Sequence, residues 1–256
     1  YVANNSLALN GGTIRDAALN DATLTLSNPG DPNSLGNNQD LIIDTSVPTI
    51  NSVSLNAGNS VLIVTFAEDV YTNDGSGNLV AADFALNITG GVATVAATPT
   101  GVTKTSQSIW MLELNISGTA NGSETLDVVP AAGNAIYDKA GNAASTSQSN
   151  NTASLTEKVL PTVTGVTSTT ADDSYRQGET IAIKVAFSEV VNVTGTPQLT
   201  LETGGSDAVV NYSGVGSGTN TLTFNYTIGA GETSGDLDYV ANNSLALNGG
   251  TIRDAA

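Results

Sequence analysis

The sequence predicts an all-β protein built from antiparallel sandwiches, and three observations support this prediction. Hydrophobic residues make up 39% of the chain, but aromatic residues only 5% and charged residues 12%. Short runs of alternating apolar and polar residues are separated by turns rich in Gly and Asn, as expected for half-buried strands. No stretch keeps a helical period for three turns. Several short strands in about 115 residues are typical of tandem immunoglobulin-like β-sandwiches, with a closed barrel as the alternative.

The first pair of strands is predicted in the middle of the chain. Along residues 60–66, alternation places three apolar side chains on one face, namely Leu62, Val64 and Phe66. A second buried row consists of Trp110, Leu112, Leu114 and Ile116. Because Trp110 is in phase with the leucines that follow it, we assign its indole to the core and not to a sugar-stacking surface.

A second pair of strands repeats this pattern nearer the C-terminus. Residues 181–187 place Ile181, Ile183, Val185 and Phe187 inward, with Lys184 outward. In the next strand the inward row is Leu222, Phe224, Tyr226 and Ile228, with Thr221, Thr223 and Thr227 facing water. These two pairs predict two separate cores.

One string occurs twice: YVANNSLALNGGTIRDAA occupies residues 1–18 and again residues 239–256. An identity of this length does not arise by chance, so the chain holds one period of a repeat plus an overlap. A weaker likeness divides this period, because VLIVTFAEDV at 61–70 resembles AIKVAFSEVV at 182–191. The period therefore contains two related domains.

Three segments are expected from this repeat. Residues 1–47 form the C-terminal part of a type-A repeat, residues 48–160 a complete type-B repeat, and residues 161–256 the N-terminal part of the next type-A repeat. Pro48 and Pro161 follow the junctions, where a missing amide donor suits a linker or the first residue of an edge strand. Because the last segment lacks strands that the first one has, we expect head-to-tail self-association of the fragment. In a longer array the same contact becomes intramolecular.

The charge balance is strongly acidic, with 24 Asp and Glu against 7 Lys and Arg and a net charge of −17. Nucleic acid and anionic membrane are therefore not expected as partners, because phosphate binding needs clustered bases. No apolar run is long enough for membrane insertion in this segment. The chain contains no His and no Cys, which excludes Ser-His-Asp and Cys-His catalysis. We expect no enzyme and no catalytic residues.

Acidic residues that recur in both domains are the candidate metal ligands. Glu68 and Glu189 each lie two residues after an inward Phe, so alternation aims the carboxylate at the core side where the strand ends. Burying an unpaired carboxylate is costly, so either the strand bends toward water or the acid meets a cation or backbone amides. Ca²⁺, which takes about six to eight oxygen ligands, is the expected cation. The candidate ligands are Asp16, Asp44, Glu68, Asp127, Asp138, Glu157, Glu189, Asp238 and Asp254.

The turn IYDKAGN at residues 136–142, and its copy IRDAALN, also have an explanation without a metal. Asp138 can cap its own turn while Asn142 adopts a left-handed conformation. Leu19 stands in the copy where this turn has Gly141. Because Leu is costly in a left-handed conformation, we expect a different turn there.

Several motifs together resemble the bacterial immunoglobulin-like repeats of giant surface adhesins. They are the FxE strand ends at Phe66 to Glu68 and Phe187 to Glu189, the segment GTPQLTLETG at 195–204, the string LALNGGTIRDAA and the IxDxAGN turn. The resemblance covers essentially the whole chain and implies long secreted stalks that calcium stiffens at the domain junctions. By position, the acidic turn of the family falls on Asp138, Asp16 and Asp254, and its strand-end acid on Glu68 and Glu189.

The sequence therefore predicts a structural extender, or stalk, segment of a secreted bacterial cell-surface adhesin. Its expected partners are neighbouring repeats of the same chain, and its expected location is extracellular, at the bacterial cell surface. One alternative is a β-sandwich module that binds a glycan or a protein through exposed Thr and Asn rows or loop tips. Another is an accessory domain of a large secreted enzyme.

Overall fold

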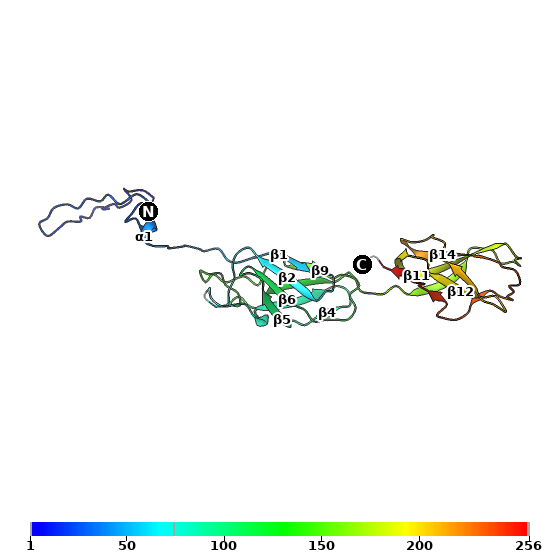
Figure 1. Cartoon of the computed structure of the whole chain (residues 1–256). Helices are drawn as coiled ribbons and strands as arrows, with labels where there is room; N and C mark the ends of the chain where they lie inside the picture. Colours follow the sequence, from blue (N-terminus) through cyan, green and yellow to red (C-terminus); the bar gives the residue numbers. More distant parts are fainter. Residues whose placement is uncertain (1, 74, 255–256) are drawn as a thin grey trace.

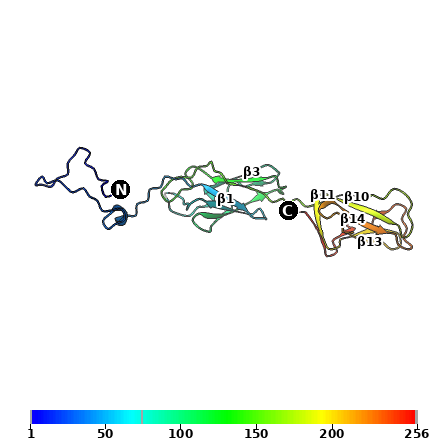
Figure 2. The same ribbon diagram turned by 90° about the horizontal axis from the view of Figure 1, so that it is seen from above.

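The computed structural model describes residues 2–73 and 75–254, and these residues confirm the all-β fold class. Two separate hydrophobic cores form, one spanning Ile50 to Leu155 and the other Ile181 to Ile252. Figures 1 and 2 show two β-sandwiches in succession, with the N-terminal segment beyond the first of them.

The first sandwich consists of a four-stranded sheet in the order β1-β2-β6-β5 and a three-stranded sheet in the order β3-β8-β9. All of these strands pair antiparallel. Their bounds are β1 Ile50–Leu55, β2 Val61–Phe66, β3 Phe84–Thr89, β5 Gly101–Lys104, β6 Ile109–Glu113, β8 Thr125–Pro130 and β9 Thr152–Ser154. A short ribbon of β4 (Thr94–Val95) and β7 (Ile116–Ser117) and a 3₁₀ helix at Ala81–Asp83 complete it.

The inward rows predicted for this sandwich are confirmed. Leu62, Val64 and Phe66 are buried, and Trp110 is only 1% exposed. The indole nitrogen of Trp110 donates a hydrogen bond to the backbone oxygen of Gln107 at 3.0 Å. Because the indole ring is buried and its one polar atom is hydrogen-bonded, no face of the ring is exposed for stacking on a sugar.

The second sandwich has one sheet of β10-β11-β14, with β17 added to β11, and another of β13-β12-β15, with β16 added to β12. The bounds are β10 Val163–Ser168, β11 Thr180–Thr194, β12 Gln198–Glu202, β13 Ala208–Asn211, β14 Thr219–Thr227, β15 Asp238–Tyr239, β16 Leu245–Ala246 and β17 Thr251–Arg253. The long strand β11 pairs with two strands in turn. Its first part pairs with β14, and the part from Asn192 onward pairs with β17.

The inward rows of the second sandwich are also confirmed, but one outward residue is wrong. Ile183, Val185, Phe187, Leu222, Phe224 and Tyr226 are all buried. Thr223, predicted to face water, is only 5% exposed. The loop after β13 covers it, since the Thr223 amide donates to the Val215 carbonyl at 3.0 Å. The Lys184 ammonium donates to the Thr223 hydroxyl at 2.7 Å.

The N-terminal segment, residues 2–47, which we call the tail, adds no strand to either sheet. Its one helix is α1 (Leu35–Asn38), where the Ser34 hydroxyl accepts a hydrogen bond from the Asn37 amide. Apolar side chains near its end are left in water, with Leu41, Ile42 and Ile43 being 67%, 81% and 93% exposed. That the tail belongs to the same repeat type as residues 161–256 stays a prediction. No helix in the described part of the chain is long and apolar enough to span a membrane.

Candidate metal centre

The structure gathers six of the predicted ligands into two groups of three carboxylates. The first acidic group is Asp44, Glu68 and Asp138, and the second acidic group is Glu157, Glu189 and Asp254. In each group, oxygens of the three carboxylates lie within 4.8 Å of one another. The groups correspond member by member in the repeat, because each has an acid just before a junction proline, an FxE acid and an IxD acid.

The first acidic group lies where the tail enters the first sandwich. Asp44 comes from the tail, Glu68 follows the end of β2, and Asp138 is buried at the start of a turn after β8 whose next residues are exposed. Asn142 connects these parts, since its backbone and side-chain amides donate to the Asp138 carboxylate at 2.8 and 2.7 Å. The same side-chain nitrogen of Asn142 donates to the backbone oxygen of Asp44 at 3.1 Å.

Asp138 and Glu68 respond to this environment in opposite ways. Burial raises the pKa of Glu68, and the negative charges of Asp138 and Asp44 raise it further. Burial also opposes ionisation of Asp138, but the hydrogen bonds from Asn142 and nearby backbone amides outweigh it and lower the pKa of Asp138. Glu68 is therefore the member whose ionised form lacks compensation and gains most from a nearby cation.

The second acidic group joins the two sandwiches. Glu157 follows β9 of the first sandwich. Glu189 lies in β11 of the second sandwich, and Asp254 directly follows β17. The Oε1 atom of Glu189 is buried and has no hydrogen-bond partner among the described residues. Burial raises the pKa of Glu189, and the charges of Glu157 and Asp254 add to this effect.

The expectation that the strand ends at Glu189 is wrong. β11 continues to Thr194, and Glu189 lies in the irregular stretch between Ala186 and Val191, where the register with β14 shifts. Directly after this stretch, from Asn192 onward, β11 pairs with β17 instead of β14. A bulge of this kind re-aims a side chain without ending the strand.

Three carboxylates in such a group repel one another. In the first acidic group, two unit charges about 5 Å apart repel by about 3 kcal/mol at an effective dielectric near 20, before water and salt screen them. A divalent cation converts this repulsion into attraction. The ligand atoms are all oxygens, which suits hard cations such as Ca²⁺ or Mg²⁺. Asp44, Glu68 and Asp138 would hold it at the first junction, and Glu157, Glu189 and Asp254 at the second.

The remaining candidate ligands, Asp16, Asp127 and Asp238, do not join either group. Asp127 accepts a hydrogen bond from the side chain of Asn151 at 3.1 Å. Asp238 accepts one from the adjacent amide of Tyr239 at 2.8 Å. Asp16 lies in the exposed tail and caps its own turn.

The two IxD turns are alike. Asp138 donates its amide to the Asn142 carbonyl, and the Asp16 amide donates to the Asn20 carbonyl, both at 3.1 Å. The left-handed residue is Gly141 with φ 89° and its counterpart Leu19 with φ 67°, so assigning that conformation to Asn142 is wrong. The expectation of a different turn at Leu19 is also wrong, because the turn closes with Leu19 in the costly conformation.

One acid of structural importance, Glu124, was not among the predicted residues. It is fully buried, and its carboxylate accepts hydrogen bonds from the amides of Val92, Ala93 and Asn121 at 2.9, 3.1 and 3.0 Å. Burial opposes its charge, but these amide donors outweigh it and lower the pKa of Glu124 to about 2. Comparing the two domains for recurring acids did not identify Glu124, because the equivalent residue in the other domain is Gly235.

The described residues thus define an all-β protein of successive sandwiches with a group of carboxylates at each of two junctions. Comparisons with known proteins add no family to this description: no family model matches, and no curated protein or solved structure gives a significant match.

Proposed function

We propose that this chain is a structural extender segment of a secreted bacterial cell-surface adhesin, in which Ca²⁺ at the domain junctions limits hinge motion. One observation carries the proposal. Each acidic group combines one carboxylate from the segment entering a sandwich with two from the end of that sandwich. A cation bound there ties consecutive parts of the chain together.

The mechanism is mechanical and not enzymatic. Ca²⁺ bridging Glu157 to Glu189 and Asp254 holds the linker against the second sandwich, which removes orientations that the free linker allows. Without the cation, the three negative charges favour separation of the two sandwiches. Affinities of about 10⁻⁴ to 10⁻³ M, as found for extracellular modules, are sufficient for this role.

The extracellular location and the immunoglobulin-like repeat character rest on the motif resemblance and on the acidic composition, with a net charge of −17. The proposed partners are neighbouring repeats of the same chain. The role of this segment is to give the stalk length and stiffness. The part of such an adhesin that binds a ligand lies at its tip, elsewhere in the protein.

Calorimetric titration of the full chain with Ca²⁺ tests the proposal. We expect two sites per chain, and we expect Glu68→Gln and Glu189→Gln to remove one site each. Asp69→Asn is the matched control, because Asp69 is exposed, adjacent to Glu68 and outside both acidic groups. Absence of calcium binding, with a melting temperature unchanged by EDTA, contradicts the proposal. Reproducible hits for the chain on a glycan array favour a binding module instead.

A further inference from the structure

The linker between the two sandwiches stays attached to the first sandwich beyond the end of β9. The Leu155 amide donates a hydrogen bond to the Glu124 carbonyl at 3.1 Å, and the Lys158 amide donates one to the Ala120 carbonyl at 2.8 Å. Both acceptors lie between β7 and β8. The chain that leaves the first sandwich therefore runs along one of its loops before it reaches the second.

Asn59, in the turn between β1 and β2, holds the linker between these two points. Its Oδ1 atom accepts a hydrogen bond from the Thr156 amide at 2.9 Å, and its Nδ2 atom donates one to the Thr156 carbonyl at 2.7 Å. One side chain thus pairs with both backbone groups of Thr156, as a neighbouring strand would. Asn59 is only 5% exposed, so these two bonds are shielded from water. They fix the residue directly before Glu157.

The turn that contains Asn59 is closed by other groups. The Asn59 amide donates to the Asn56 carbonyl at 2.9 Å. The side chain of Asn56 accepts hydrogen bonds from the amides of Ser60 and Val61 at 2.8 and 3.1 Å. The side chain of Asn59 is therefore free to serve the linker instead of its own turn.

The loop beneath the linker is itself fixed. The buried carboxylate of Glu124 accepts the amide of Asn121 and the amides of a second loop. At the tip of the loop, a Cβ atom on Gly122 would lie 3.3 Å from the Cβ atom of Glu157. The side chain of Glu157 therefore rests against a loop that a buried acid holds in place.

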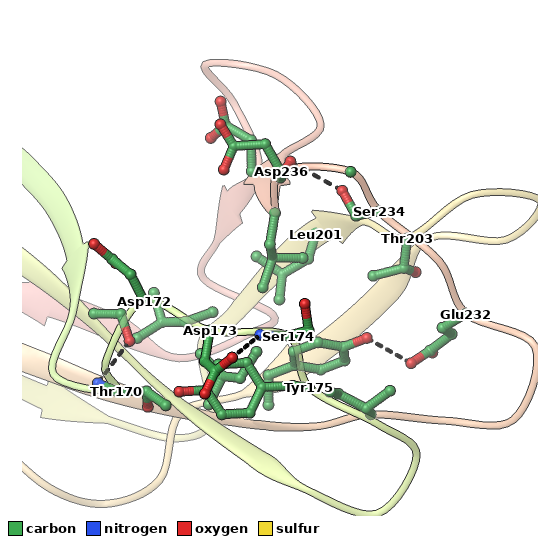
Figure 3. A pocket seen from close by; sticks show the side chains of 18 of the residues that line it. Thr170, Asp172, Asp173, Ser174, Tyr175, Leu201, Thr203, Glu232, Ser234 and Asp236 are labelled. Atoms are coloured by element: carbon green, nitrogen blue, oxygen red, sulfur yellow. Dashed lines mark hydrogen bonds between the residues drawn. The ribbon is translucent and has the colours of Figure 1, made fainter.

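The equivalent loop of the second sandwich, residues 228–234, is also fixed by a carboxylate. Glu232 accepts a hydrogen bond from the Tyr226 hydroxyl at 2.6 Å and one from the Gly229 amide at 2.5 Å. Figure 3 shows Glu232 at the side of a groove of about 590 Å³. Both sandwiches thus use an acid to hold the same loop, and in the first sandwich that loop supports the linker.

The second sandwich takes hold of the chain at Thr162. The Thr162 amide donates to the Ser188 hydroxyl at 3.0 Å, and the Ser188 amide donates to the Thr162 carbonyl at 2.8 Å. Ser188 directly precedes Glu189. The point at which the second sandwich fixes the linker is therefore next to its own metal-ligand candidate.

Between Lys158 and Thr162 lie only residues 159–161, which we call the hinge. Among the described residues, no hydrogen bond joins the hinge to either sandwich. Val159 and Leu160 are 40% and 77% exposed. Three residues span about 10 Å at most, so the point where the first sandwich releases the chain determines where Glu157 lies relative to the second.

We propose that Asn59 is a positioning residue for the second acidic group. It holds the linker on the first sandwich, so that bending is confined to the hinge and Glu157 is held in place for a cation. Asn59 itself binds no cation. Because Glu157 is ordered beforehand, closing the second acidic group around Ca²⁺ costs less free energy. The statement about the cation rests on the proposed function, whereas the attachment of the linker does not.

Limited proteolysis of the full chain with trypsin in EDTA tests the attachment without a cation. Trypsin cleaves after Lys and Arg, so Lys158 is a cleavage site at the start of the hinge. We expect Asn59→Gly to speed this cleavage about tenfold or more, because Gly keeps the left-handed turn but releases the linker. Asn150→Gly is the matched control and should be cleaved like the wild type. Asn150 has a φ of 57°, close to the 55° of Asn59, but it is exposed and precedes β9.

The calcium affinities of the two acidic groups separate positioning from a general loss of stability. In a chain that carries Glu68→Gln, calorimetry measures the second acidic group, and there Asn59→Gly should weaken calcium binding about tenfold. In a chain that carries Glu189→Gln, calorimetry measures the first acidic group, and there Asn59→Gly should leave the affinity unchanged. Fluorescence of Trp110 shows whether the first sandwich of each variant is folded.

Asn59→Asp keeps the test decisive if Asn59→Gly fails to fold. The carboxylate has nearly the same shape and still accepts the Thr156 amide, but it cannot donate to the Thr156 carbonyl. We therefore expect faster cleavage after Lys158 in this variant as well.

Equal cleavage rates for the wild type and the folded Asn59 variants, or equal losses of affinity at the two acidic groups, overturn the inference. If calcium does not bind while Asn59→Gly speeds cleavage, the calcium-stiffened stalk is refuted and the attachment of the linker is confirmed. If calcium binds the second acidic group equally well with and without Asn59→Gly, the stalk stands and the positioning role is refuted.

Discussion

Replacing Glu68 by Gln should change the stability of the first sandwich in opposite directions with and without calcium. Glu68 is half-buried beside Asp44 and Asp138, and its raised pKa shows that its ionised form is disfavoured there. The amide has nearly the same shape and no charge. Without a cation the substitution removes repulsion, whereas with a cation it removes a ligand.

The size of each effect follows from the geometry of the group. Each of the two charge pairs contributes about 3 kcal/mol at most, and screening at this half-exposed site leaves a net gain of about 1 kcal/mol in EDTA. At a calcium concentration of 100 times Kd, the wild type gains about 2.7 kcal/mol by binding. If Glu68→Gln binds calcium too weakly to share this gain, it becomes the less stable protein by about 2 kcal/mol.

Urea unfolding followed by tryptophan fluorescence measures this effect. The chain has one Trp, Trp110 in the core of the first sandwich, so the signal reports that domain alone. Asp69→Asn controls for loss of a charge outside the group. If Glu68→Gln and the wild type keep the same order of stability in EDTA and in calcium, the assignment of Glu68 as a ligand is wrong.

Three further predictions concern the supporting residues. Asn142→Ala removes the hydrogen bonds to Asp138 and to the Asp44 carbonyl and should weaken calcium binding about tenfold or more by calorimetry, whereas Asn20→Ala in the exposed copy of the turn should not. Leu155→Ala should destabilise the first sandwich by about 2–5 kcal/mol in urea unfolding; a loss below this range contradicts its core role. Because the pKa of Glu124 falls from 4.5 to about 2 on folding, its stabilisation is complete above about pH 4.5 and is lost toward pH 2. In acid titrations with EDTA, Glu124→Gln should lack this loss and should lower the melting temperature by several degrees at pH 7, and an unchanged acid transition would refute this role.

Alternation along the strands was sufficient to predict the two cores. Residues such as Val64 and Phe224 are buried as their period requires, because strand pleating fixes which face each side chain takes. Thr223 departs from this rule because a loop covers the outer face of β14. Coverage of this kind depends on tertiary packing and leaves no mark on the local period.

The candidate ligands show the same limit. Recurrence of acids at equivalent positions identified both acidic groups, but it included Asp127, whose partner Asn151 is set by the pairing of β8 with β9. The continuation of β11 past Glu189 depends on β17, which is distant in sequence. Glu124 was missed because its charge is satisfied by amides of two separate loops. Local pattern identifies the residue types, whereas strand pairing decides which of them meet.

The central claim is that calcium at the junctions stiffens the chain, and small-angle scattering on the full chain tests it most directly. We predict a larger maximum dimension and a narrower range of conformations in saturating calcium than in EDTA. Scattering curves that coincide in the two conditions, from a chain shown by calorimetry to be calcium-loaded, would contradict the account.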